Sequence, residues 1–101
     1  MSTQVEIVRQ QYPTLFAQLS QLLFTADPVH ISSAGFPDEY EPEVATILPR
    51  LEHAQRESDV LDIIHEEFVR WFDASVAGPK EKYTDLATQV WSTWTEAKAA
   101  K

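Results

Sequence analysis

The hydrophobic residues recur every three or four positions, the spacing that places side chains on one face of an α-helix. Residues 4–25 show this spacing first, and Pro13 interrupts it, so we expect a helix to end, kink or restart there. The pattern stops at Asp27, because a residue that precedes a proline avoids helical backbone angles. The apolar positions of this first segment are Val5, Val8, Tyr12, Leu15, Phe16, Leu19, Leu22 and Leu23.

Three further segments have the same period. One helix is predicted from Pro42, a favoured first helical residue, and Pro49 should kink or divide it. Another is predicted to begin at Ser58, which can cap it, and the chain breaks again at Gly78. The last helix is predicted over residues 79–97. The apolar positions are Val44, Ile47, Leu48 and Leu51, then Val60, Leu61, Ile64, Phe68, Trp71 and Phe72, then Tyr83, Leu86, Ala87, Val90, Trp91 and Trp94.

Residues 27–41 form the longest irregular segment, and two prolines, two serines and a glycine oppose regular structure in it. Some of its apolar residues, Val29, Ile31, Phe36 and Tyr40, are expected to fasten it to the core, and a loop of this length in a small domain is often functional. We therefore predict an all-α fold in one domain over residues 1–101. It would be a compact four-helix bundle or orthogonal array with one long ordered loop between helices 1 and 2.

The composition of the chain fits a packed domain. The 101 residues are 44% hydrophobic, which suffices for a single core, and the absence of cysteine excludes disulfides and thiolate metal sites. No apolar run reaches the roughly 20 residues that span a bilayer. The first residues also lack the cationic start and apolar core of a signal peptide. A cytoplasmic location is therefore expected.

The net charge of −8 is concentrated in the middle of the chain. Residues 27–67 hold eleven acidic and two basic residues, whereas the rest of the chain is close to neutral. A negative field of this kind repels nucleic-acid phosphates and anionic lipids and attracts cationic proteins. We therefore expect a basic protein partner, with no binding to nucleic acid or membrane.

The segment "FPDEYEPEV", residues 36–44, holds the densest group of carboxylates. Its spacing does not fit a calcium loop, and the helix dipole accounts for Glu41 and Glu43 but not for the acids before Tyr40. A tyrosine among carboxylates can anchor and orient a basic partner. The predicted partner-binding residues are Asp38, Glu39, Tyr40, Glu41, Asp59, Asp62 and Glu66.

The chain carries no recognisable catalytic motif, so we expect no enzyme, cofactor or metal. His65-Glu66-Glu67 lacks the second histidine of a metalloprotease helix, because position 69 is valine. His65 borders an apolar stripe and is expected to be packed. One alternative is a small-ligand or metal-dependent activity in a pocket near residues 27–41, around His30, Tyr40 and His65. Another is a structural homodimer with no separate partner.

The stretches "DPVHI" and "DEYEPEVATILPRL" resemble the YugE-like family of small, uncharacterised bacterial proteins. The matching positions are Asp27, Pro28, Ile31, Tyr40, Glu41, Glu43, Val44, Ile47 and Leu51. The resemblance covers about a third of the chain and implies a four-helix fold without an established activity. Residues 32–37 make a longer loop than that family implies. Immunity proteins of the colicin-nuclease type are similar in size, acidity and helical character, but no residue motif maps onto them.

Overall fold

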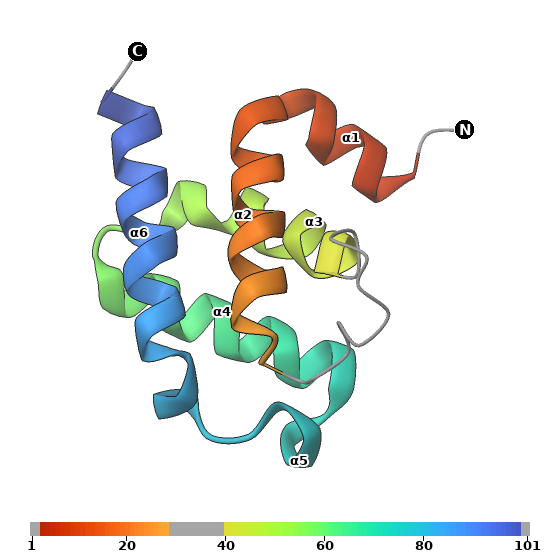
Figure 1. Ribbon diagram of the computed structural model, residues 1–101, viewed down its shortest axis with the longest axis vertical. Helices are drawn as coiled ribbons and strands as arrows, with labels where there is room; N and C mark the ends of the chain where they lie inside the picture. The colour runs from red at the N-terminus through yellow and green to blue at the C-terminus, as the bar shows by residue number, and fades with distance from the viewer. Residues whose placement is uncertain (1–2, 29–39, 100–101) are drawn as a thin grey trace.

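The computed structural model describes residues 3–28 and 40–99, and these residues form six α-helices and two 3₁₀ turns without a strand (Figure 1). The all-α prediction is confirmed, but the expected number of helices was too low. Pro13 divides the first predicted helix, and a short helix follows the third. The elements are α1 (Gln4–Gln11), α2 (Pro13–Ala26), α3 (Glu41–Arg50), η3 (Leu51–His53), α4 (Glu57–Phe72), α5 (Ala74–Ala77), η4 (Lys80–Tyr83) and α6 (Thr84–Ala99).

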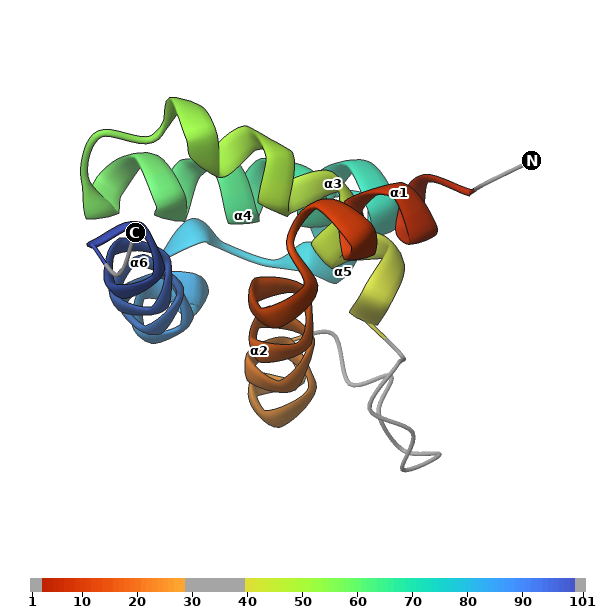
Figure 2. The same cartoon turned by 90° about the horizontal axis from the view of Figure 1, so that it is seen from above.

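The helices are arranged in two crossing layers. In Figure 2, α3 and α4 lie side by side in the upper layer, and α2 and α6 lie below and cross them. Helix α1 packs on α3 and turns sharply into α2. The helices of the two layers therefore meet across one shared interior.

That interior contains buried side chains from all six helices. The aromatic ring of Phe68 is central, with the rings of Tyr40, Phe72 and Tyr83 at centroid distances of 6.0, 5.8 and 5.2 Å. Trp94 is buried, which confirms its predicted core packing. Trp71 differs, because 46% of it is exposed although it was predicted on the buried face of its helix. The largest buried side chains are Val8, Phe16, Leu19, Leu23, Tyr40, Ile47, Leu48, Leu51, Ile64, Glu67, Phe68 and Tyr83.

The helix boundaries follow local chemistry. The Thr3 hydroxyl caps α1 by accepting the Glu6 amide hydrogen at 3.2 Å, and Pro13 occupies the first turn of α2, as predicted. Helix α2 ends at Asp27, which adopts a left-handed conformation with φ 45°. Ser58 was the wrong cap for the third predicted helix. The helix begins at Glu57, with Arg56 as its N-cap residue and without a side-chain cap. The Asp59 carboxylate accepts the amide hydrogen of Gln55, just before the helix, at 2.9 Å.

The short helix α5 depends on Asp73. The carboxylate of Asp73 accepts the Val76 amide hydrogen at 2.9 Å and so caps the helix. The backbone of Asp73 lies at φ 85° and ψ 168°, a region that residues other than glycine rarely adopt. Gly78, at φ 78°, ends the helix at its other side. A strained aspartate and a glycine thus delimit a turn that hydrophobic periodicity does not predict.

A polar cluster holds the end of α6 against the α1–α2 junction. The Glu52 carboxylate accepts hydrogen bonds from the Tyr12 hydroxyl at 2.7 Å and the Lys98 ammonium at 3.0 Å. The ring of Tyr12 lies 6.2 Å from that of Trp94, and Lys98 lies over the Trp94 ring at 4.7 Å. Burial, together with the neighbouring Glu52 carboxylate, raises the pKa of Tyr12 to about 12.

We predict that stability falls as the pH rises from about 10 to about 12. Burial raises the pKa of Tyr83 to about 12 as well, so Tyr12 and Tyr83 stay protonated in the fold where the unfolded chain, with tyrosine pKa values near 10, has lost these protons. The unfolded state therefore binds fewer protons over this range and is favoured. Chemical denaturation at a series of pH values, with tyrosinate absorbance followed in parallel, measures both effects. Tyr12→Phe should flatten the pH dependence, and an unchanged slope would contradict the assignment.

Candidate functional site

The structure describes five of the seven predicted partner-binding residues, whereas Asp38 and Glu39 lie outside the described residues. Tyr40 is fully buried, with its ring beside Phe68, and its hydroxyl donates to the Asp27 carboxylate at 2.7 Å. The expectation of an exposed tyrosine anchor is therefore wrong. The aromatic ring immediately before α3 packs into the core, and Asp27 satisfies its hydroxyl.

Ion pairs weaken the acidic surface that the charge count predicts. Glu41 pairs with Arg9, and Asp62 pairs with Lys80 at 2.9 Å. Glu52 pairs with Lys98 at 3.0 Å. Because these bases come from segments far from the acids in sequence, a count along the chain overstates the local negative charge.

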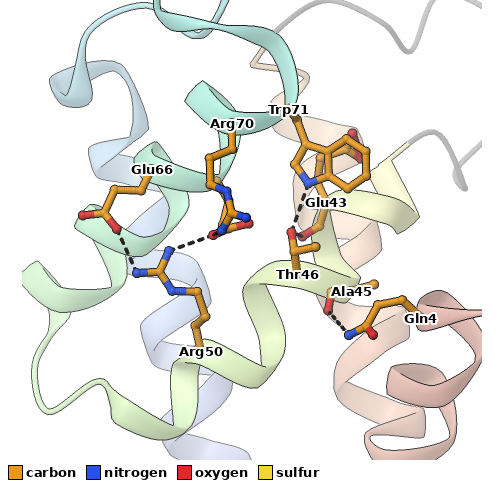
Figure 3. A network of polar contacts seen from close by, with 9 residues as sticks. Gln4, Glu43, Ala45, Thr46, Arg50, Glu66, Arg70 and Trp71 are labelled. Carbon is orange, nitrogen blue, oxygen red and sulfur yellow. Dashed lines mark hydrogen bonds and ion pairs between the residues drawn. The ribbon is translucent and has the colours of Figure 1, made fainter.

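The most developed polar site lies where α3 and α4 pack together, which we call the α3–α4 seam. Arg50, at the end of α3, donates from Nη2 to Glu66 Oε1 and from Nη1 to Glu67 Oε2, both at 2.8 Å (Figure 3). Arg70 also contacts Glu67 Oε2, at 3.3 Å. The Glu67 side chain is only 2% exposed, so the two guanidinium groups compensate a carboxylate that has lost its water.

The Arg50 bridge separates two hollows along the seam. The acidic hollow, of about 360 Å³, lies toward the start of α4, and the tryptophan hollow, of about 240 Å³, lies toward its end. Two of the predicted partner-binding acids, Asp59 and Asp62, line the first hollow, and Glu66 lies at the bridge itself. The acidic hollow is lined by Arg50, His53, Asp59, Asp62 and Ile63, and the tryptophan hollow by Thr46, Glu67, Arg70 and Trp71.

Trp71 is the distinctive side chain of the second hollow. Its indole N–H donates to the Thr46 hydroxyl at 3.0 Å, and that hydroxyl donates to the Glu43 carbonyl at 3.0 Å (Figure 3). The indole is therefore fixed in orientation while half of it stays in water. The neighbouring Arg70 side chain is 75% exposed. Tryptophan and arginine are the residues most enriched at the energetic centres of protein interfaces.

Sequence reasoning missed Trp71 because its helical spacing places it on the apolar stripe. The spacing places the side chain on this stripe but does not identify the residue that it meets. That residue is Thr46, a polar side chain at the edge of α3, so the indole lies at the rim rather than in the core.

The structure does not bring the predicted histidine pocket together. His30 lies outside the described residues and Tyr40 is in the core. His65 is half-buried against the ring of Tyr83 at 5.8 Å, with its Nε2 atom 3.0 Å from the Gly78 carbonyl, which confirms the prediction of a packed histidine. Within residues 3–28 and 40–99, no group of three or more potential ligand side chains could hold a metal ion.

A separate hollow of about 550 Å³ lies between the end of α2 and the start of α6. Its lining combines apolar side chains with four polar ones, a composition typical of small-ligand sites. The lining residues are Ala26, Asp27, Pro28, Lys82, Tyr83, Asp85, Leu86 and Gln89. Asp27 and Pro28 belong to the segment 27–41, near which the alternative ligand pocket was predicted, but neither Tyr40 nor His65 is among the described residues that line this hollow.

Comparison with known proteins adds no family assignment. No protein-family model, curated protein or solved structure matches this chain. The resemblance to the YugE-like family therefore stays a prediction. Among the described residues, no helix has both the length and the apolar character that crossing a bilayer requires.

We predict that Tyr40→Ala destabilises the protein by roughly 3–5 kcal/mol, because it removes a buried aromatic ring from beside Phe68. Tyr40→Phe should cost only about 1 kcal/mol, since it removes the hydroxyl bond to Asp27 and keeps the ring. Urea denaturation gives both values. Val76→Ser is the control, because Val76 is a small side chain that is 47% exposed, and it should change the free energy of unfolding by less than about 1 kcal/mol. Wild-type stability in Tyr40→Ala would place this tyrosine outside the core.

Proposed function

We propose that this protein is a small protein-binding module that docks a basic partner along the α3–α4 seam, with Trp71 as its anchor. This proposal rests on Trp71. Its indole is half-exposed and is held in one orientation by its hydrogen bond to Thr46. It lies beside the tryptophan hollow, next to the exposed side chain of Arg70. An exposed aromatic side chain of fixed orientation gives large contact area at a small loss of conformational entropy.

Electrostatics supports a basic partner. The chain carries a net charge of −8, and Asp59 and Asp62 line the acidic hollow at the other end of the seam. Carboxylates in these positions accelerate the encounter with a cationic protein and orient it, more than they add affinity. Of the originally predicted set, this surface keeps Asp59, Asp62 and Glu66 and leaves out Tyr40 and Glu41.

Inhibition of the partner is the form of this function that we favour. A module that covers the basic surface of another protein blocks whatever that surface binds, as an immunity protein does with a toxin. The proposal assigns no catalytic residue, metal or cofactor to the chain.

A second candidate function is small-ligand binding in the hollow between α2 and α6. Its volume of about 550 Å³ is in the range of ligand pockets, and Lys82, Asp85 and Gln89 are polar side chains in its lining. Gln89→Trp would place a large side chain in this hollow from an exposed position and leave the seam unchanged. Screening by thermal stabilisation therefore separates the two candidates: a ligand whose effect disappears in Gln89→Trp but persists in Trp71→Ser belongs to this hollow.

We predict that Trp71→Ser abolishes capture of the cognate partner. The tagged protein is used for affinity purification from extract at low salt, the partner is identified by mass spectrometry, and binding is remeasured with both proteins purified. Loss of the indole should weaken binding by roughly 2–4 kcal/mol, the range of interface hot spots. Val76→Ser and Ile7→Ser are the matched controls, because Val76 and Ile7 are exposed to the same extent, 47% and 45%, on other helices.

Three results would contradict this proposal. The first is equal binding by Trp71→Ser and Val76→Ser. The second is affinity that does not fall as ionic strength rises, because steering by exposed carboxylates is screened by salt. The third is a mass in light scattering that doubles with concentration and returns to that of a monomer in Trp71→Ser, since the seam would then join two copies of this chain.

A further inference from the structure

We infer that the α3–α4 seam recognises an extended peptide segment with a basic side chain at one end and an apolar side chain next to an acidic one at the other. This inference rests on the proposed function and adds the chemistry and spacing of the segment that the seam accepts. It follows from three properties of the seam: its length, the opposite charges at its two ends, and the polar bridge between them.

The length of the seam fixes the spacing. Asp59 and Arg70 are eleven residues apart on α4, about three helical turns, so their side chains leave the same face of the helix. At 1.5 Å per residue this separation is about 16 Å. An extended chain rises about 3.3 Å per residue, so about five residues connect contacts at the two hollows.

The two ends of the seam differ in charge. Asp59 and Asp62 line the acidic hollow together with Arg50 and His53, and Asp62 pairs with the exposed Lys80. A lysine or arginine side chain of the segment can take the place of Lys80 there. Arg70, at the other end, contacts Glu67 through one nitrogen at 3.3 Å, and Glu67 already accepts a shorter bond from Arg50. The exposed guanidinium of Arg70 therefore has further N–H groups to offer a carboxylate, and Trp71 beside it offers an apolar surface.

The bridge between the hollows favours an extended segment over a helix. Arg50 reaches across the seam to Glu66 and Glu67, so the groove is interrupted by a polar crossing (Figure 3). A helix is 10–12 Å wide with its side chains and needs a continuous apolar groove. An extended chain can instead pass over the bridge with small or polar residues and place its larger side chains in the two hollows.

Selection from a random library of twelve-residue peptides tests this inference. Peptides displayed on phage are enriched on the wild-type protein after depletion on Trp71→Ser. We expect a consensus with lysine or arginine at one end and, about five residues away, an apolar residue adjacent to aspartate or glutamate. Binding of the consensus peptide is then measured by fluorescence polarisation.

A double-mutant cycle tests the acidic end. Arg70→Ala should weaken binding of the consensus peptide by roughly tenfold and should not affect a peptide whose acidic residue is replaced by alanine. Arg56→Ala, which removes an exposed arginine at the start of α4, is the matched control and should show no coupling to that acidic residue.

The inference is overturned if no peptide is enriched, if the consensus lacks this order or spacing, or if Arg70→Ala shows no coupling. Its failure differs from failure of the proposed function. Peptides without the pattern, together with a partner that still requires Trp71, would leave the docking surface standing and remove only the segment chemistry. Partner capture that does not depend on Trp71 would remove both.

Discussion

The burial of one carboxylate, that of Glu67, shapes the whole α3–α4 seam. A charge removed from water destabilises a fold unless opposite charges and hydrogen bonds surround it. Here Arg50 crosses from α3, and Arg70 approaches from α4, the helix that also carries Glu67. Both guanidinium groups therefore contact one carboxylate. The crossing of Arg50 joins the two helices, and it also divides the groove between them into two separate hollows. The binding surface that we propose is thus a consequence of how this buried charge is compensated.

Hydrophobic periodicity predicted the helical class and most of the core because the apolar stripes are regular. Pro13 marked a break, because a proline suits the first turn of a new helix, whereas Pro49 lies inside α3 and does not divide it. Periodicity did not predict α5, since four residues are too few to show a period. That helix depends on the cap and the strained backbone of Asp73, and neither backbone strain nor the choice of cap can be read from residue types alone. The Ser58 cap was wrong for the same reason, because α4 begins at Glu57 with Arg56 as its N-cap residue, and so places Ser58 inside the helix.

The candidate site was harder to predict than the fold, and Tyr40 and Trp71 show why. Sequence reasoning placed Tyr40 at the centre of a binding surface because acids flank it, although it also counted Tyr40 among the residues that could fasten segment 27–41 to the core. It placed Trp71 in the core because its spacing fits a stripe. The structure buries Tyr40 and leaves 46% of Trp71 exposed. In each case the deciding contact comes from elsewhere in the chain, Asp27 for Tyr40 and Thr46 for Trp71. Ion pairs such as that of Arg9 with Glu41, 32 residues apart, likewise escape a count of charges along the sequence.

The acidic residues that form ion pairs within the fold differ in how readily they can bind a basic partner instead. Asp62 and Lys80 are each 48% exposed, and water and salt screen ion pairs at such positions so that they add little to stability. An incoming cation can therefore replace Lys80. Glu66 is also exposed, so an incoming cation can replace Arg50 at its carboxylate in the same way. Glu67 cannot, because removing an arginine would leave its buried carboxylate less compensated. The acids of α4 therefore form two classes, an exchangeable set that can meet a partner and a fixed one that maintains the surface on which the partner docks.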